Sequence, residues 1–155
     1  MRIVAPASSK QDLEDARLLF REYAESVAEP CCFASFEQEL AGLPGEYAAP
    51  GGVLLIARDG MEAAGCVGLR RHDTLSGEMK RLYLRMQYRG SGLGRKLAED
   101  VIDECRKRRY ARLLLDTLPK MTAAIALYRA LGFRETGPYL DTPTPGAICF
   151  ELRLS

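Results

Sequence analysis

The sequence predicts one α/β domain over residues 1–155, built on a mixed sheet with about four helices. Three strand-like segments, separated by turn signals, precede a glycine-rich loop, and this order predicts antiparallel strands in the N-terminal half. A strand–helix–strand crossover follows, which predicts a parallel central pair. Two last strand-like segments predict a C-terminal hairpin. We expect the sheet to split where the parallel pair diverges.

Composition and charge are those of an ordinary globular protein. Apolar residues make up 47% of the chain and charged residues 28%, and Lys and Arg number 22 against 21 for Asp and Glu. A net charge of +1 argues against bulk binding of nucleic acid, which depends on a large basic excess. No apolar run reaches the roughly 18–20 residues of a membrane span, and the N-terminus lacks a signal-peptide core. We therefore expect no nucleic-acid and no membrane partner.

The five cysteines show no C-x-x-C spacing. A zinc site or a disulfide framework is therefore not expected, no metal is predicted, and a cytoplasmic location follows as the default. Cys66, Cys105 and Cys149 lie in apolar runs, which is typical of thiols buried in a core.

The N-terminal third predicts one edge strand and two helices. Arg2–Ala5 is a short strand candidate, and Ser8 or Ser9 can cap the following helix with Gln11 and Asp12 as capping-box partners. The apolar stripe of that helix is formed by Leu13, Ala16, Phe20, Tyr23, Ala24 and Val27.

Ser35 and Gln38 suggest a second cap, which opens a short helix that runs to about Leu43. The apolar connector at 31–36, CCFASF, lies between the two helices. It can pack one helix on the other or form part of a pocket wall.

Three strands are expected before the glycine loop, at Val53–Ala57, Glu62–Arg70 and Met79–Leu84. Asp59-Gly60 is a short hairpin signal between the first two strands. Gly65 and Gly68 either weaken the second strand or mark a bulge. A looser turn around Asp73–Gly77 leads to the third strand.

After the loop, a helix at about Leu93–Arg108 leads to the continuous apolar run of Leu113–Asp116, which suits a buried central strand. A helix at Met121–Leu131 ends at Gly132, a typical residue after a helix C-terminus. The closing hairpin is formed by Phe133–Glu135 and Ile148–Leu152.

The basic, glycine-rich loop Gln87–Gly94 joins the third strand to a helix. A helix that begins in glycines presents unpaired backbone N–H groups and the positive end of its dipole, and glycines let a phosphate approach them closely. Formal charge is added around this point by Arg85, Arg89, Arg95 and Lys96. The sequence therefore predicts an anion site, most simply for a diphosphate.

Three kinds of phosphate loop compete for this stretch. A Walker-type loop is excluded, because no hydroxyl residue directly follows the basic pair after Gly94. A dinucleotide fingerprint is supported by Asp116, about 20 residues downstream, where a ribose-binding acid would stand. Against it, Arg95 occupies the position of the third glycine, and only 39 residues follow Asp116, too few for the second half of such a sheet.

The third reading rests on two motifs. Residues 87–92, QYRGSG, match the Q/R-x-x-G-x-G/A loop of the GNAT acetyltransferase superfamily, and residues 124–133, AIALYRALGF, resemble its A-x-x-L-Y-x-x-x-G-F segment. The two motifs occur in the right order, about 35 residues apart. The chain thus resembles a GNAT superfamily N-acetyltransferase over roughly residues 50–135, and the resemblance implies a GNAT-like fold.

That resemblance implies acetyl-CoA as the acetyl donor and places it on matching positions. The pyrophosphate would lie on the backbone N–H groups of the loop, at Arg89, Gly90, Ser91, Gly92, Leu93, Gly94 and Arg95. The pantetheine arm would run beside Leu82, Tyr83 and Leu84, pairing with the strand edge. A backbone N–H near Leu84 would hydrogen-bond the thioester oxygen. The asparagine that many members carry before the tyrosine is missing, and Pro119-Lys120-Met121-Thr122 stand there instead.

Two residues are the candidates for proton transfer. Tyr128 stands where the family's general-acid tyrosine usually falls, and a phenol with a pKa near 10 stays protonated at neutral pH; the alternative is a core residue of an amphipathic helix. Glu78 is the candidate base, acting directly or through water, and the alternative is a solvated charge beside Lys80. His72, the only histidine, and Asp116 are weaker candidates.

We therefore expect an acetyl-CoA-dependent N-acetyltransferase that moves the acetyl group directly to a primary amine of a small molecule or a protein. The alternatives are a non-catalytic acyl-CoA-binding sensor or interaction module and a nicotinamide-binding domain. The acceptor pocket would be formed by residues 28–45, 72–77 and 140–146. Its few charges are mostly acidic and suit a cationic amine: Glu29, Glu37, Glu39, Asp73 and Asp141. A homodimer would be ordinary for the family.

Overall fold

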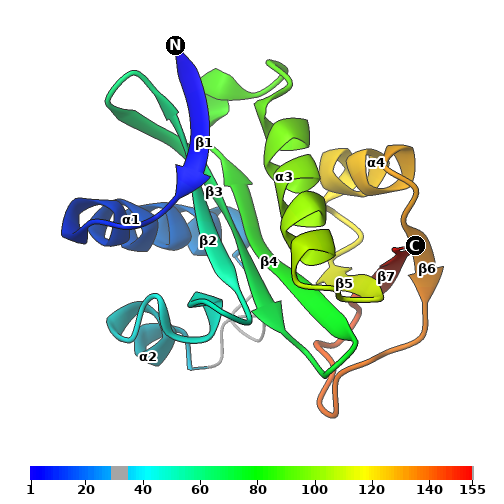
Figure 1. Cartoon of the computed structure of the whole chain (residues 1–155). Coiled ribbons are helices and arrows are strands. Elements are labelled where there is room, and N and C mark those ends of the chain that lie inside the picture. The colour runs from blue at the N-terminus through cyan, green and yellow to red at the C-terminus, as the bar shows by residue number, and fades with distance from the viewer. Residues whose placement is uncertain (29–34, 155) are drawn as a thin grey trace.

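The computed structural model describes residues 1–28 and 35–154, and in this part of the chain a seven-stranded mixed sheet is covered by helices on both faces (Figure 1). The elements in order are β1 (Arg2–Pro6), α1 (Lys10–Val27), α2 (Phe36–Ala41), the 3-10 turn η2 (Gly45–Tyr47), β2 (Val53–Asp59), β3 (Glu62–Arg71), β4 (Ser76–Leu84), the 3-10 turn η3 (Met86–Tyr88), α3 (Leu93–Lys107), β5 (Arg112–Thr117), α4 (Thr122–Ala130), β6 (Arg134–Thr136) and β7 (Ile148–Arg153).

The strand order is β1-β2-β3-β4-β5-β7-β6. Strands β1 to β4 pair antiparallel with their neighbours, β4 and β5 pair parallel, and β7 pairs antiparallel with both β5 and β6. This is the predicted fold class: antiparallel N-terminal strands, a parallel central pair and a C-terminal hairpin. The β4–α3–β5 crossover produces the parallel pair because a helix of this length can return the chain to the same end of the sheet.

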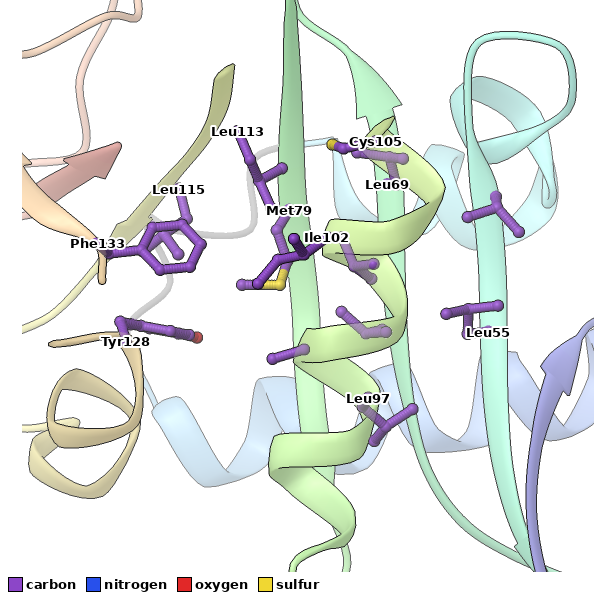
Figure 2. Packing of buried hydrophobic residues seen from close by; sticks show 14 of the residues in the cluster. Leu55, Leu69, Met79, Leu97, Ile102, Cys105, Leu113, Leu115, Tyr128 and Phe133 are labelled. Carbon is purple, nitrogen blue, oxygen red and sulfur yellow. The ribbon is translucent and has the colours of Figure 1, made fainter. Parts of the chain in front are cut away.

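Residue alternation along β2 assigns the two cores. Leu54 and Ile56 pack with Phe20 of α1 and Leu40 of α2 on one face. The other face carries α3 and α4, and Figure 2 shows Leu97, Ile102 and Cys105 of α3 among Leu55, Leu69 and Met79 of the strands. Because successive strand residues point to opposite faces, two separate hydrophobic clusters form on one sheet. Cys66, Cys105 and Cys149 are buried and not in disulfides, as predicted.

Several element ends follow the expected local chemistry. Ser9 caps α1 in a capping box with Asp12, Gly60 adopts a φ of +63° in the β2–β3 turn, and Gly132 adopts +100° after α4. The register of β2 against β3 shifts so that Ala64, next to Gly65, is the extra residue, and the glycine-rich strand does contain an irregularity.

Two boundaries and one helix cap differ from the prediction. Strand β4 begins at Ser76, inside the predicted turn, because Arg70 and Arg71 pair with Glu78 and Gly77. Helix α2 ends at Ala41 rather than near Leu43. Ser35 is the N-cap residue of α2, as predicted, but it has a φ of +62° and its side chain makes no capping hydrogen bond. Most of the apolar connector at 31–36 lies outside the described residues.

Two features are absent from the described residues. None of the helices in these ranges combines the length and the apolar character that a membrane crossing requires. The same residues hold no group of three or more His, Cys, Asp or Glu side chains placed to bind a metal ion.

Candidate active site

Strands β4 and β5 separate after only three residue pairs, from Ser76↔Arg112 to Glu78↔Leu114. Strand β4 then continues to Leu84 with the edge that faces β5 unpaired. The opening is a narrow cleft, lined by Tyr23, Val27, Met79, Lys80, Arg81, Leu82, Leu115, Asp116, Thr117, Leu118, Met121, Ala124, Tyr128, Thr144 and Ala147. The expected split of the sheet is therefore present, and it lies between the ends of α1 and α4.

Tyr128 projects from α4 into the wall of this cleft (Figure 2). Its ring packs against Phe133 and Phe150, with ring centroids 5.7 and 6.2 Å away, and the residue is 6% exposed. Among the described residues its hydroxyl makes no hydrogen bond, yet no side-chain oxygen there is both fully buried and unpaired. The phenol oxygen therefore reaches the open space of the cleft. Burial raises the pKa of Tyr128, so the hydroxyl stays protonated at neutral pH.

Glu78 is not a solvated charge, because it is 1% exposed. Its carboxylate accepts hydrogen bonds from Arg70 Nε (2.8 Å) and from the hydroxyl of Tyr139 (2.5 Å), and Lys80 Nζ lies 4.0 Å away. Burial alone would raise the pKa of Glu78, but the charges of Lys80 and Arg70 outweigh it and hold the pKa below its ordinary value. Glu78 is not one of the described residues that line the cleft.

Lys80 and Asp116 form the charged part of the cleft wall, with Nζ and Oδ1 3.4 Å apart. Both side chains are largely buried. Asp116 is thus a residue of the cleft wall. His72 lies just outside this group, where its ring meets that of Tyr139 edge-on with centroids 5.1 Å apart.

The glycine loop leaves the start of α3 open for an anion. Gly90 and Gly92 have φ values of +78° and +84°, a region in which glycine carries no steric cost. Gly92 is the N-cap and makes no side-chain cap, and no acidic residue stands in the first turn. The N–H groups of residues 93–95 therefore have no acceptor within the described chain, whereas that of Lys96 bonds to Gly92 O.

The basic residues around the loop are less available than the sequence suggested. Arg85 makes a two-pronged ion pair with Glu22 of α1, and Lys96 pairs with Asp100 one turn along α3. Arg95 lies 3.6 Å from Glu99, while Arg89 donates from Nε to the carbonyl of Leu84. The backbone groups, rather than free guanidinium groups, are thus the strongest anion-binding feature of the loop.

The proposed pantetheine strand has two kinds of side chain. Leu82 and Leu84 pack on the α3 face of the sheet. Tyr83 packs on the α1 face, where its hydroxyl donates to Glu22 Oε1 at 3.2 Å. Any contact of Tyr83 with a ligand on the α3 face would therefore come from its backbone.

Three of the five acidic residues assigned to the acceptor side have cationic partners. Glu37 pairs with Arg21 at 2.9 Å, and Glu39 pairs with Arg81 at 2.8 Å. Asp73 lies 3.9 Å from Arg112. Glu29 lies outside the described residues. The acidic excess of these segments is therefore largely neutralised and no longer favours a cationic acceptor.

Sequence reasoning missed the partners that organise the site. Tyr139, Arg70 and Arg81 each bond to a carboxylate that lies between 8 and 61 residues away in the chain. Lys120 lies in the segment where many family members carry an asparagine. It donates to the carbonyl of Val27 and so links the start of α4 to the end of α1. No local spacing pattern marks such contacts.

Known proteins match most of this chain. The model of the Acetyltransferase (GNAT) family matches residues 8–133. An uncharacterized N-acetyltransferase of Schizosaccharomyces pombe is 36% identical over 147 residues, which cover 94% of this chain and 90% of the relative.

Solved structures share the fold. An acetyltransferase from Streptococcus agalactiae superposes with a TM-score of 0.84 at 21% identity, covering 99% of this chain and 98% of the other. An N-acetyltransferase from Thermoplasma acidophilum, solved in complex with coenzyme A, gives 0.77 at 18% identity and covers 99% of both chains.

Proposed function

We propose that this chain, which belongs to the acetyltransferase (GNAT) family, moves an acetyl group from acetyl-CoA directly to a primary amine, with Tyr128 as the general acid. Family membership makes it an acetyl-CoA-dependent acyltransferase. The direct transfer, the amine acceptor and the roles of individual residues are the proposal. The observation that carries it is the buried phenol of Tyr128, whose oxygen reaches the cleft between β4 and β5.

The path of the cofactor follows from the free groups of the backbone. Residues 93–95 offer three unpaired N–H groups and the positive end of α3 to the pyrophosphate. We assign the pyrophosphate to Arg89–Arg95, including Gly90, Ser91, Gly92, Leu93 and Gly94. The open edge of β4 at Leu82, Tyr83 and Leu84 would pair with the pantetheine amides, as an added strand does.

The reaction requires one proton to leave the amine and one to reach the thiolate. The neutral amine attacks the thioester carbonyl, the C–S bond breaks, and the departing sulfur takes the proton of the Tyr128 hydroxyl. Glu78 receives the proton of the amine through water, because its own side chain does not line the cleft. Its low pKa keeps Glu78 ionised and ready to accept at neutral pH.

A binding module without catalysis is less well supported. A sensor needs the anion site and the strand edge, but it has no use for a phenol hydroxyl exposed in the wall of the cleft. A nicotinamide site is disfavoured because Asp116 bonds to Lys80 across the cleft rather than standing free for a ribose. A cytoplasmic location, supported by three free buried thiols, and a homodimer remain part of the proposal.

Calorimetry tests the proposal first. Acetyl-CoA, CoA and NAD are titrated into the purified protein in one buffer, and transfer to a panel of small amines, amino acids and peptide N-termini is then followed by release of free CoA thiol. Binding of acetyl-CoA with thiol release supports the enzyme. Binding without release to any amine favours the sensor, and preference for NAD would overturn the assignment of the loop.

A further inference from the structure

Arg81 occupies an irregular point of β4. Cys66 pairs with Tyr83 and Gly68 pairs with Lys80, so Arg81 and Leu82 together face the single residue Val67 of β3. This is a β-bulge, which bends a strand and re-aims the residues after it. Arg81 has a φ of +61°, a left-handed conformation that side chains other than glycine rarely adopt. The bulge follows soon after Glu78, the last residue of β4 that pairs with β5.

An ion pair holds this conformation from the far side of the sheet. Arg81 Nε and Nη2 donate to the two oxygens of Glu39 in α2, at 3.0 and 2.8 Å. The hydroxyl of Tyr47 in η2 donates to Glu39 Oε2 at 3.1 Å, and Phe36 lies under the guanidinium. The Arg81 side chain is 7% exposed. A strained residue persists only where its surroundings fix it, and here α2 and η2 supply those surroundings.

The backbone of the bulge is held as well. The thiol of Cys66 donates to the carbonyl of Arg81 at 3.4 Å. A Cβ on Gly68 would lie 2.6 Å from the ring of Tyr47, so this ring fills the space beside the bulge. Arg81 therefore has one side on the cleft and its guanidinium in the opposite core.

We propose that the Arg81–Glu39 ion pair positions β4 for acetyl transfer, by setting the bulge so that the backbone of residues 82–84 meets the thioester of bound acetyl-CoA. Arg81 and Glu39 are then positioning residues that act through the strand and touch no reacting atom. The inference rests on the proposed function. It makes α2 part of the machinery that aligns the donor.

A buried ion pair need not do more than join two elements, so a matched pair is needed for comparison. Arg58 of β2 provides it: Nη2 donates to Asp12 and Asp15 of α1, at 2.7 and 2.8 Å. Like Arg81, it links a helix on this face to a strand, with side chains between 20 and 23% exposed. It is not among the described residues that line the cleft.

The test compares Glu39→Gln, Arg81→Met, the double variant E39M/R81M and Arg58→Met. Single variants at 39 and 81 are expected to lower kcat by about 10- to 100-fold, as small misplacements of reacting groups do, with little change in the Kd of acetyl-CoA. The double variant leaves no unpaired buried charge, so its melting temperature should recover while its kcat stays low. Arg58→Met should lose stability and keep its kcat.

Recovery of kcat together with stability in the double variant would overturn the proposal, as would an equal loss of kcat in Arg58→Met. A second readout needs no transfer: hydrogen exchange of the amides at 81–83 should accelerate in Glu39→Gln and not in Arg58→Met. Unchanged exchange in Glu39→Gln would also overturn it. Because exchange is measured without acetyl-CoA, a failure of the enzyme assignment stays distinguishable from a failure of the ion pair.

Discussion

The hydroxyl of Tyr139 donates a 2.5 Å hydrogen bond to Oε2 of Glu78, from a position 61 residues further along the chain. The loop that carries Tyr139 joins β6 to β7, whereas Glu78 stands where β4 last pairs with β5. A hydroxyl that donates to a carboxylate stabilises its ionised form. The bond therefore links the C-terminal loop to the protonation state of the proposed base.

Replacing Tyr139 by Phe tests that link. The variant removes one donor to the ionised carboxylate, so the pKa of Glu78 should rise. A raised pKa means that Glu78 becomes protonated at a higher pH, so the acid limb of the kcat/KM profile should shift to higher pH. The measurement is a pH–rate profile of wild type, Tyr139→Phe and Glu78→Gln.

The Glu78→Gln profile should have no such limb, and persistence of the limb there would exclude Glu78 as the base. His72→Ala is the control, since it removes the ring contact with Tyr139 and keeps the hydrogen bond. It should leave the acid limb in place.

The Tyr128→Phe variant should turn over about 10²- to 10⁴-fold more slowly, the usual contribution of a general acid. Its affinity for acetyl-CoA should be unchanged, because the ring and its packing are preserved. Its melting temperature should change little, since the hydroxyl makes no hydrogen bond to the described residues. Steady-state kinetics and calorimetry measure both properties.

Tyr110→Phe is the matched control for the loss of a phenol oxygen. Tyr110 donates to the carbonyl of Gly51 at 2.6 Å and does not line the cleft, so its variant should lose about 1 kcal/mol of stability and keep its turnover. Wild-type turnover in Tyr128→Phe would remove the acid role.

Gly92→Ala should weaken acetyl-CoA binding and stability together. An alanine at a φ of +84° costs roughly 1–2 kcal/mol, and relief of that strain would move the N–H groups at the start of α3. Gly60→Ala, at +63° in the β2–β3 turn, should cost a similar amount of stability and leave binding intact. Thermal unfolding and calorimetry separate the two; equal affinities in both variants would contradict the loop assignment.

Asp12→Asn should destabilise the protein at neutral pH and not in acid. The N–H of Ser8 lowers the pKa of Asp12 to about 2, from an ordinary value of 3.8, with help from Arg58. A depressed folded pKa adds stability above pH 4 that is lost as the pH falls toward 2. Asparagine keeps the capping oxygen, so about 1 kcal/mol should separate the proteins at pH 7.

Denaturant unfolding at pH 7, 4 and 2.5 measures the free energy of unfolding of the wild type and of Asp12→Asn. The difference between the two should narrow steadily as the pH falls. A difference in stability that stays constant with pH would show that the charge of Asp12 does not carry the effect.

Local patterns predicted most of the fold because each acts within a few residues. The apolar stripe of α1, the hairpin turn at Asp59-Gly60 and the start of α3 directly after Gly92 are confirmed. Ser35 makes no side-chain cap because its own backbone is left-handed, and the residues before it are outside the described chain. Its side-chain type alone carried no information about φ.

The site was less predictable because its electrostatics are long-range. The sequence allows Glu78 to be a solvated charge, whereas in the structure it is buried and bonded to Arg70 and Tyr139 from other elements. The sequence likewise presents Glu39 as a free acid, but Arg81, 42 residues away, forms an ion pair with it. Net charge and spacing report which groups exist, whereas burial and pairing decide what those groups can still bind.

The two halves of the sheet are hydrogen-bonded to each other only over a short stretch between β4 and β5. Three residue pairs join strands β1–β4 to strands β5, β7 and β6. Beyond Glu78, the described residues of β4 and β5 are not paired with each other. A molecule lying along the open edge of β4 would act as the missing seam between the two halves. Bound acetyl-CoA would then stabilise the contact between the two halves of the sheet during each turnover, and release of CoA would weaken that contact again.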